Sequence, residues 1–299
     1  MGIKKFNIDF FKALTPAIVI SAILIVLGIY AILMMFNGKG VGIDFSGGNA
    51  ITVKFSKKMA IDEIRQIASK TGINFDIAHL PEENKAIFKT KLVEVNGKKV
   101  SDILDDVLNA TLSKNGYMVE GIVEIGPRVS SDLKKDATIA FILSAIGIIL
   151  YLAWRFEKKF GIAAAIATYH DVIGIVGIMY LMGYEMDLLI LTALLTIAGY
   201  SLTDTVVVFD RIRENLRKKV STNLKEVLNK SINETMNRTI ITSLTTLFSS
   251  VALLIFGGEV LRSFAIAITL GIIIGTYSSI FIASPLLIAL KLDPKKIKK

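Results

Sequence analysis

The chain has 299 residues, of which 53% are hydrophobic and only 20% carry a charge. Soluble domains contain about 45–50% apolar residues, so the composition favours a membrane protein. Cysteine is absent and the only histidines are His79 and His170, which excludes disulfides, thiolate metal sites and cysteine nucleophiles and argues against a histidine metal site. We therefore expect no metal and no cofactor.

Six apolar stretches are long enough to cross a hydrocarbon core, which needs about 20 residues. In chain order they lie between Lys12 and Lys39, Asp136 and Arg155, Lys159 and Glu185, Asp187 and Asp210, Arg238 and Glu259, and Arg262 and Lys291. The first stretch is longer than the apolar part of a signal peptide, about 7–15 residues, and is read as a retained span. The pattern predicts an α-helical membrane protein with six transmembrane helices.

Positive charges alternate along the connections. The N-terminus, the second and fourth short connections and the tail KLDPKKIKK are rich in lysine or arginine, whereas GYEMD and GGEVLR are not. Because basic loops stay on the cytoplasmic side, we predict that both termini are cytoplasmic. This distribution also accounts for the net charge of +9, and no nucleic-acid-binding motif accompanies it, so we expect no nucleic acid partner.

Residues 38–135 have the composition of a soluble domain and would lie outside the membrane. Residues 49–55 alternate as a strand does, and residues 60–70 have helical spacing. Two further strands are expected over 74–80 and 86–95, then a helix over 100–112 and a last strand over 117–125. The order β-α-β-β-α-β predicts a ferredoxin-like α+β domain.

These elements divide the chain into four expected parts. They are a cytoplasmic N-terminus with the first helix over 1–37, the external domain over 38–135, helices two to six over 136–290 with a basic cytoplasmic loop over 210–238, and a basic tail over 291–299. Within the basic loop, residues 223–236 have an amphipathic pattern, which is typical of a helix on the inner membrane surface.

The fourth span contains an ionisable residue, Asp204. Thr196 and Tyr200 precede it at intervals of four residues, so all three lie along one helix face, and Ser201 is close to the same end. A carboxylate at a helix centre costs about 2.5–3.5 kcal/mol on insertion scales. We therefore expect Asp204 to face the interior of the helix bundle.

The fifth span offers a second polar face at a similar depth. It includes Thr239 and Ser243, and Arg238 stands at its start, where a long side chain can reach Asp204 if the two helices are neighbours. In one interpretation Asp204 is a structural acceptor that never titrates. In the other, which we favour because intramembrane ionisable residues are usually functional, Asp204 carries protons and Arg238 modulates it.

The third span contains the adjacent pair His170 and Asp171 near its middle. Neighbouring residues do not share one helix face fully, so the pair is not an obvious relay dyad. A structural bond between helices is at least as plausible as proton transfer, and Asp171 is kept as a candidate for the proton pathway.

Five motifs in order along the chain resemble the SecF family of protein-export membrane proteins. They are GIDFSGG at 42–48, GPRV at 126–129, HDV at 170–172, GYSLTDTVVVFDRIREN at 199–215 and NRTIITSLTTL at 237–247. The fourth motif is the most specific, although this chain has SLTD where many members have SIND. The substitution spares the carboxylate.

The resemblance implies an auxiliary, non-enzymatic subunit in the cytoplasmic membrane that uses the proton-motive force to promote protein export. The implied partners are SecD, the Sec translocon channel, exported polypeptides and membrane lipid. By position, Asp204 matches the proton-linked aspartate of the family and Arg238 its fifth-span arginine. Two alternatives stay open: a proton-coupled small-molecule transporter of the resistance-nodulation-division type, and a receptor whose spans only anchor an external domain.

Overall fold

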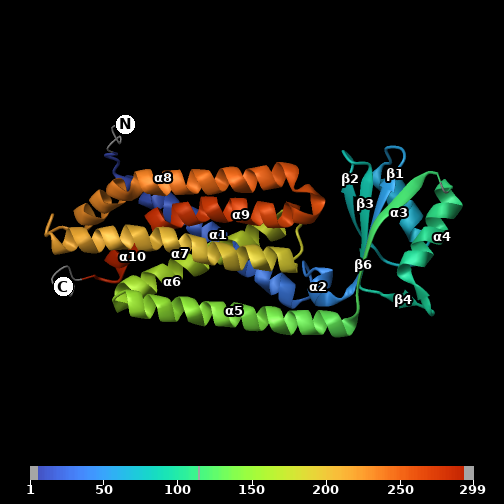
Figure 1. Cartoon of the computed structure of the whole chain (residues 1–299), viewed down its shortest axis with the longest axis horizontal. Coiled ribbons are helices and arrows are strands. Elements are labelled where there is room, and N and C mark those ends of the chain that lie inside the picture. The colour runs from blue at the N-terminus through green and yellow to red at the C-terminus, as the bar shows by residue number, and fades with distance from the viewer. Residues whose placement is uncertain (1–5, 114, 293–299) are drawn as a thin grey trace. The chain divides into compact units, whose positions relative to one another are not determined.

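The computed structural model describes residues 6–113 and 115–292. These residues form two compact units, one of residues 6–40 with 139–292 and the other of residues 41–113 with 115–138. The first unit is a bundle of long helices and the second is built around a sheet (Figure 1). Among the described residues, six helices are long and apolar enough to cross a membrane. The chain is a multi-pass membrane protein, as its sequence predicts.

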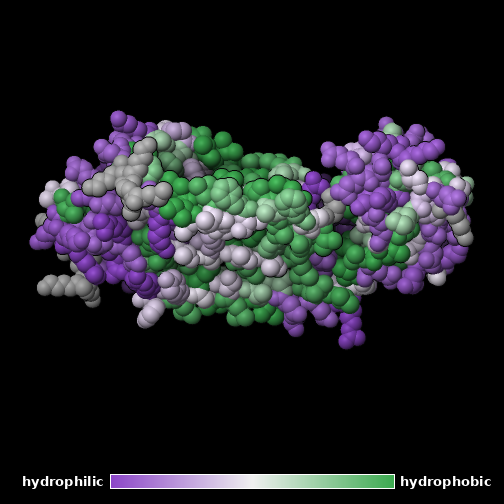
Figure 2. Space-filling model, turned by 45° about the horizontal axis from the view of Figure 1, so that its top comes forward, coloured by the Kyte–Doolittle hydropathy of each residue, from purple (hydrophilic) through white to green (hydrophobic). Residues whose placement is uncertain are grey.

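The α+β domain separates the first two spanning helices, and the later ones follow one another with short connections. After the 3₁₀ turn Phe10–Ala13, the spanning helices are α1 (Leu14–Phe36), α5 (Pro127–Arg155), α6 (Lys158–Leu181), α7 (Leu188–Arg217), α8 (Leu224–Phe256), and α9 (Gly258–Ser278), which continues through the π-helical segment η2 (Ser279–Ala283) into α10 (Ser284–Ala289). The predicted tail over 291–299 lies, from residue 293 onwards, outside the described residues. Hydrophobic residues gather over the middle of the bundle and hydrophilic ones at the end where α7 meets α8 (Figure 2).

The predicted basic loop over 210–238 is mostly helix. α7 continues to Arg217, and α8 begins at Leu224 behind Asn223, whose side chain accepts a hydrogen bond from the backbone N–H of Lys225 at 3.0 Å. An N-cap of this kind satisfies one of the orphan donors of the first turn. Only residues 218–223 connect the two helices.

The expectation of a separate amphipathic helix on the membrane surface is wrong. Residues 224–236 form the first part of α8, and their apolar side chains Val227, Leu228 and Ile232 are fully buried in a core shared with α6 and α7. The same periodicity that fits a lipid surface also fits a protein groove, and here the protein provides the apolar partner.

The second unit has the predicted β-α-β-β-α-β order. Its elements are β1 (Gly48–Phe55), α3 (Ile61–Ser69), β2 (Asp76–Leu80), β3 (Lys85–Thr90), α4 (Val100–Leu112) and β6 (Tyr117–Ile125), with a short hairpin of β4 (Glu94–Val95) and β5 (Lys98–Lys99) and a single turn, α2 (Ile43–Ser46), before β1. The antiparallel sheet has the order β2-β3-β1-β6, and α3 and α4 share a core with it. This arrangement confirms the ferredoxin-like prediction.

Small residues bring α1 and α6 into close contact. A Cβ built on Gly177 would lie 2.6 Å from the backbone nitrogen of Gly28, and one built on Gly28 would lie 2.2 Å from the carbonyl oxygen of Ile173. These neighbours are backbone atoms, which do not move aside as a flexible side chain does. In the membrane, where lipid is as apolar as the helices, such close packing is a main source of helix association.

We predict that Gly177→Ala destabilises the bundle by about 1–3 kcal/mol, because an extra methyl group in a packed interface forces the helices apart. Gly147→Ala in α5 is the matched control, since no atom lies within 4 Å of its Cβ position. Thermal unfolding in detergent measures both. Equal losses in the two variants would contradict close packing of α1 on α6.

Candidate functional site

Asp204 lies in α7 at a point where three helices meet. Its Oδ1 accepts a hydrogen bond from the Thr239 hydroxyl of α8 at 2.9 Å, and its Oδ2 accepts one from the Ser279 hydroxyl at 2.9 Å. Ser279 is the first residue of η2. Each carboxylate oxygen therefore has one hydroxyl donor from a different helix. The carboxylate is half-buried, so it keeps limited access to its surroundings.

The structure does not form the ion pair that we expected between Asp204 and Arg238. Arg238 lies close enough to interact electrostatically with Asp204, but its side chain is exposed and makes no ion pair with Asp204. The physical reason is helix geometry. Successive residues of an α-helix are rotated by about 100°, and Thr239, the next residue, is the one that points to Asp204.

A second carboxylate, Asp171 of α6, lies fully buried. Its Oδ2 accepts hydrogen bonds from the Ser201 hydroxyl of α7 and from the Ser278 hydroxyl of α9, the latter at 2.7 Å. Its Oδ1 lies 2.9 Å from Nδ1 of His170. Asp171 thus connects α6, α7 and α9. A bond between helices was one of the two roles considered from the sequence, the other being proton transfer.

Two consecutive serines join the carboxylates. Ser278 donates to Asp171 and Ser279 donates to Asp204, at the junction where α9 gives way to the π-helical η2. A π-helical turn is rare and frequently marks a functional site. Neither serine was predicted as part of the site. Their signal in the sequence was a run of four adjacent hydroxyl-bearing residues, 276–279, inside the sixth span.

The side chains of His170 and Asp171 meet, with 2.9 Å between Nδ1 and Oδ1, although adjacent residues of a helix do not share one face fully. The other ring nitrogen of His170, Nε2, is buried and has no hydrogen-bond partner among the described residues. The ring of Tyr277 lies beside it, with ring centroids 6.4 Å apart. The Tyr277 hydroxyl donates in turn to the carbonyl oxygen of Ala17 in α1 at 2.5 Å.

The other predicted polar residues divide into two groups. The hydroxyl of Ser243 in α8 lies 2.7 Å from that of Thr276 in α9, so it continues the row of interhelix bonds that Thr239 begins. Thr196 and Tyr200 do not reach Asp204. Thr196 is exposed and donates to the carbonyl oxygen of Thr192 at 2.8 Å, whereas Tyr200 packs at the edge of the core between α6, α7 and α9.

We predict that the two carboxylates differ in their effect on stability. Asp171→Ala leaves three buried partners without an acceptor and is expected to cost about 3–5 kcal/mol. Asp204→Ala leaves the buried hydroxyls of Thr239 and Ser279 without their carboxylate acceptor, beside a position that is itself half-buried, and is expected to cost about 1–2 kcal/mol. Thermal unfolding in detergent compares them. A larger loss in Asp204→Ala would contradict the assignment of Asp171 as the structural anchor.

Comparison with known proteins gives consistent results. Residues 92–293 match the family model described as protein export membrane protein SecD/SecF, C-terminal. A protein translocase subunit SecF from Thermodesulfovibrio yellowstonii is 47% identical over 96% of this chain and 95% of its own length. Another, from Desulfurispirillum indicum, is 38% identical over 96% of this chain and 93% of its own length.

The solved structures agree with the sequences. The crystal structure of SecDF from Thermus thermophilus, described as a translocon-associated membrane protein, matches with a TM-score of 0.81 and 34% identity. The match covers 98% of this chain and 40% of the SecDF chain. SecDF in a super-membrane-facing form matches with a TM-score of 0.69 and 33% identity over the same 40% share of its length. The chain belongs to the SecD/SecF family of protein-export membrane proteins and is similar in sequence to its SecF members over nearly its whole length.

Proposed function

We propose that this protein is an auxiliary subunit of the Sec protein translocation machinery, which pairs with a SecD-type partner and uses the proton-motive force to promote export. It acts without a cofactor and without enzymatic activity, in the cytoplasmic membrane, with both termini cytoplasmic and the ferredoxin-like domain external. The observation that carries this proposal is a half-buried carboxylate, Asp204, held only by hydroxyls inside a chain of this family.

Hydroxyl partners suit a proton carrier better than an ion pair does. A carboxylate with a close cationic partner stays ionised, whereas one held by Thr239 and Ser279 can be bound in either protonation state, since a hydroxyl both donates and accepts. Protonation would change the bonds that Asp204 makes to α8 and to η2. The binding or release of one proton at Asp204 would thereby change the contacts between helices.

A partner chain in the membrane is supported by polar residues that the described chain leaves uncovered. Thr192, Thr196 and Thr203 form an exposed stripe on α7, and Arg238, Thr242, Thr245 and Ser249 form one on α8. Each hydroxyl in these stripes donates to a carbonyl of its own helix. Polar residues in spans normally face protein or a water-filled cavity, so we propose that the partner covers both stripes.

The channel of the translocon and the exported polypeptide are proposed as further partners, on the strength of the family alone. The comparisons give no support to a small-molecule transporter of the resistance-nodulation-division type. The receptor alternative leaves the cost of placing Asp204 in the membrane unexplained.

The proton proposal is tested by Asp204→Asn in vesicles that contain the translocon and the SecD-type partner. We expect export driven by an imposed proton gradient to fall to the level seen without a gradient. Asparagine can still bond to both hydroxyls, accepting from one at its oxygen and donating to the other from its NH₂, but it binds no proton. Translocation of a protease-protected precursor gives the readout. The matched control is Thr196→Val in the same helix, which keeps the shape of the side chain at the proposed interface and removes only a hydroxyl that bonds to its own helix, so export should be unchanged.

Unchanged gradient-driven export in Asp204→Asn would overturn the proton-carrier role. Co-purification with the partner serves as the folding check, since a variant that retains its partner has kept its membrane fold. Loss of export in Thr196→Val to the same extent would show that the assay reports on packing of α7 and not on the carboxylate.

The partner proposal is tested by placing a bulky residue in the uncovered stripe. Thr196→Trp is expected to reduce co-purification of the SecD-type partner about tenfold, because an indole cannot fit in a packed helix interface. Val26→Trp is the control, at an exposed apolar position of α1. Equal recovery of the partner with both variants would contradict the proposed interface.

A further inference from the structure

The strap, residues 6–13, is the segment that leads into α1, and it lies against the first turns of α8 (Figure 1). Residues 10–13 form the 3₁₀ turn before α1, and the side chain of Asp9 accepts a hydrogen bond from the backbone N–H of Phe11 at 3.2 Å. A cap of this kind satisfies one of the backbone donors that the turn leaves free. The strap therefore has a defined backbone conformation from its contact with α8 to the start of α1.

Two asparagines of α8 bind the backbone of the strap. Asn233 accepts a hydrogen bond from the backbone N–H of Ile8 at 2.8 Å through Oδ1 and donates one from Nδ2 to the carbonyl oxygen of Ile8 at 2.9 Å. Asn229, one turn earlier on the same face of α8, accepts a hydrogen bond from the backbone N–H of Phe10 at 3.0 Å. An amide side chain offers both a donor and an acceptor, as a peptide group does, so Asn233 pairs with Ile8 as a neighbouring strand would. The side chain of Ile8 is exposed, so α8 holds the strap by its backbone.

Phe10 anchors the strap in the bundle. Its side chain is buried in the core formed by α6, α7, η2 and the first part of α8. Its ring meets the ring of Phe281 edge to face, with centroids 6.1 Å apart, a geometry that aromatic rings favour. Phe281 belongs to η2 and lies two residues after Ser279, which donates to Asp204. The strap is thus bound to α8 by its backbone and to η2 by a side chain.

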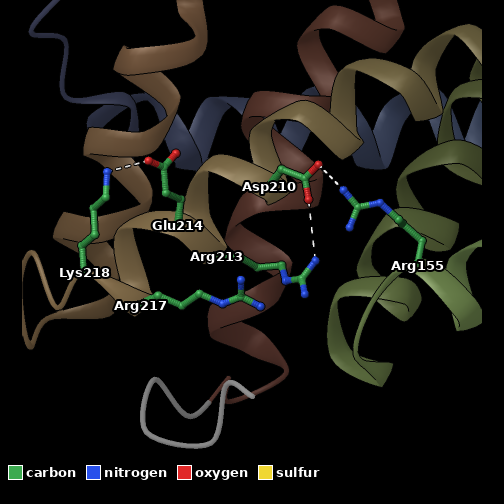
Figure 3. Close-up of a pocket in the computed structure, with 6 residues that line it drawn as sticks. All are labelled: Arg155, Asp210, Arg213, Glu214, Arg217 and Lys218. Carbon is green, nitrogen blue, oxygen red and sulfur yellow. Dashed lines mark hydrogen bonds and ion pairs between the residues drawn. The ribbon is translucent and has the colours of Figure 1, made fainter. Parts of the chain in front are cut away.

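The ends of α7 and α8 beside the strap are joined to each other. Glu234 of α8 accepts hydrogen bonds from Arg211 at 2.7 Å and from the buried amide of Asn215 at 2.6 Å, both on α7. α7 is also held to α5, because Asp210 lies 2.5 Å from the guanidinium of Arg155 at the end of that helix (Figure 3). These bonds unite α5, α7 and α8 at this end of the bundle, so a displacement of η2 here is a displacement against all three.

The strap and Asp204 join the same two elements. Thr239 of α8 and Ser279 of η2 each donate to Asp204, and the strap links Asn233 of α8 with Phe281 of η2. Asn233 precedes Thr239 by six residues, about 9 Å along a helix, and Phe281 follows Ser279 by two. α8 and η2 are therefore fastened twice within a short distance, once through a titratable carboxylate and once through amide and aromatic groups that do not titrate.

We propose that the strap is a clasp that positions η2 for the proton step at Asp204, with Asn229, Asn233 and Phe10 as positioning residues. The clasp rests on the proton-carrier role proposed above. Because its own groups do not titrate, it keeps η2 beside α8 while the bonds at the carboxylate change.

Protonation of Asp204 loosens its hold on η2. An ionised carboxylate only accepts, so Thr239 and Ser279 both donate to it. Once Asp204 carries a proton, one of its oxygens becomes a donor, and the hydroxyl beside that oxygen must turn round or break its bond. With the clasp in place, Ser279 stays within reach and restores its bond when the proton leaves. Without the clasp, η2 can settle away from α8, and the next proton no longer moves it.

The clasp is tested by removing both amides of α8 in vesicles that contain the translocon and the SecD-type partner. In Asn229→Ala/Asn233→Ala we expect the gradient-driven part of export to fall about threefold to tenfold, with export measured without a gradient as the internal reference. Alanine is the best helix former and Ile8 is exposed to water, so the variant is expected to fold. Asn233→Ala alone removes two of the three bonds and should lose less. The matched control is Asn7→Ala, which removes an exposed amide from the strap itself and should leave gradient-driven export unchanged.

Hydrogen exchange at the backbone amides of Ile8 and Phe10 reports on the clasp independently of export. In the chain purified with its membrane partner, we expect these amides to exchange about tenfold faster in Asn229→Ala/Asn233→Ala than in the wild type, since their acceptors are removed. In Asn7→Ala they should exchange as in the wild type.

Asp204→Asn in the same vesicles separates the clasp from the proton-carrier role. Loss of gradient-driven export in Asp204→Asn but not in Asn229→Ala/Asn233→Ala would overturn the clasp and leave the proton role standing. Unchanged export in Asp204→Asn would overturn the proton role and the clasp with it. Unchanged amide exchange in Asn229→Ala/Asn233→Ala, or an equal loss of export in Asn7→Ala, would overturn the clasp alone.

Discussion

A carboxylate inside a membrane must find donors within the protein, and this constraint organises the helical unit. Two carboxylates lie in its spans, and together they draw on side chains from α6, α7, α8, α9 and η2. Hydrogen bonds are short and directional, so they fix the level at which two helices meet, whereas close packing at small residues sets how near the helices lie. The hydrogen bonds to Asp171 and Asp204 therefore fix the level at which these helices meet.

Glycines in α9 let this helix approach α7 closely enough for these hydrogen bonds to form. Gly271 of α9 faces the side chain of Ile197 and Gly275 faces Ser201, so α9 can approach α7 closely. That approach places Ser278 and Ser279 one turn further on, where they reach the two carboxylates. A wider separation of the helices would lengthen both hydrogen bonds beyond useful range, because a serine side chain is short.

Much of the architecture could be predicted because it is encoded locally. The spans follow from runs of apolar residues, and the α+β domain follows from strand and helix periodicities between residues 48 and 125. The site could be predicted in part. Asp204 and Thr239 were found as polar residues at matching depth, since depth can be counted along each helix.

The remaining part of the site depends on which faces meet, and no local pattern encodes that. Arg238 was expected at Asp204 and is displaced by its neighbour Thr239, a difference of one residue and a rotation of about 100°. Ser278 and Ser279 were missed because a serine in a span usually bonds to its own helix. Here both also do so, with Gly275 and Thr276, while donating to a carboxylate. The interhelix bond becomes visible only when the helices are assembled.

The two carboxylates differ in their exposure, and this difference suits them to different roles. Asp171 is fully buried with partners at both oxygens, so a change in its charge would disturb three helices at once and is strongly opposed. Asp204 is half-buried and beside the uncovered stripes of α7 and α8, so its charge can change at smaller cost. Because Ser278 and Ser279 are consecutive, movement of η2 at Asp204 is resisted by the fixed bond at Asp171. In the proton-carrier role that we propose, Asp171 would be the fixed point against which protonation of Asp204 moves a helix.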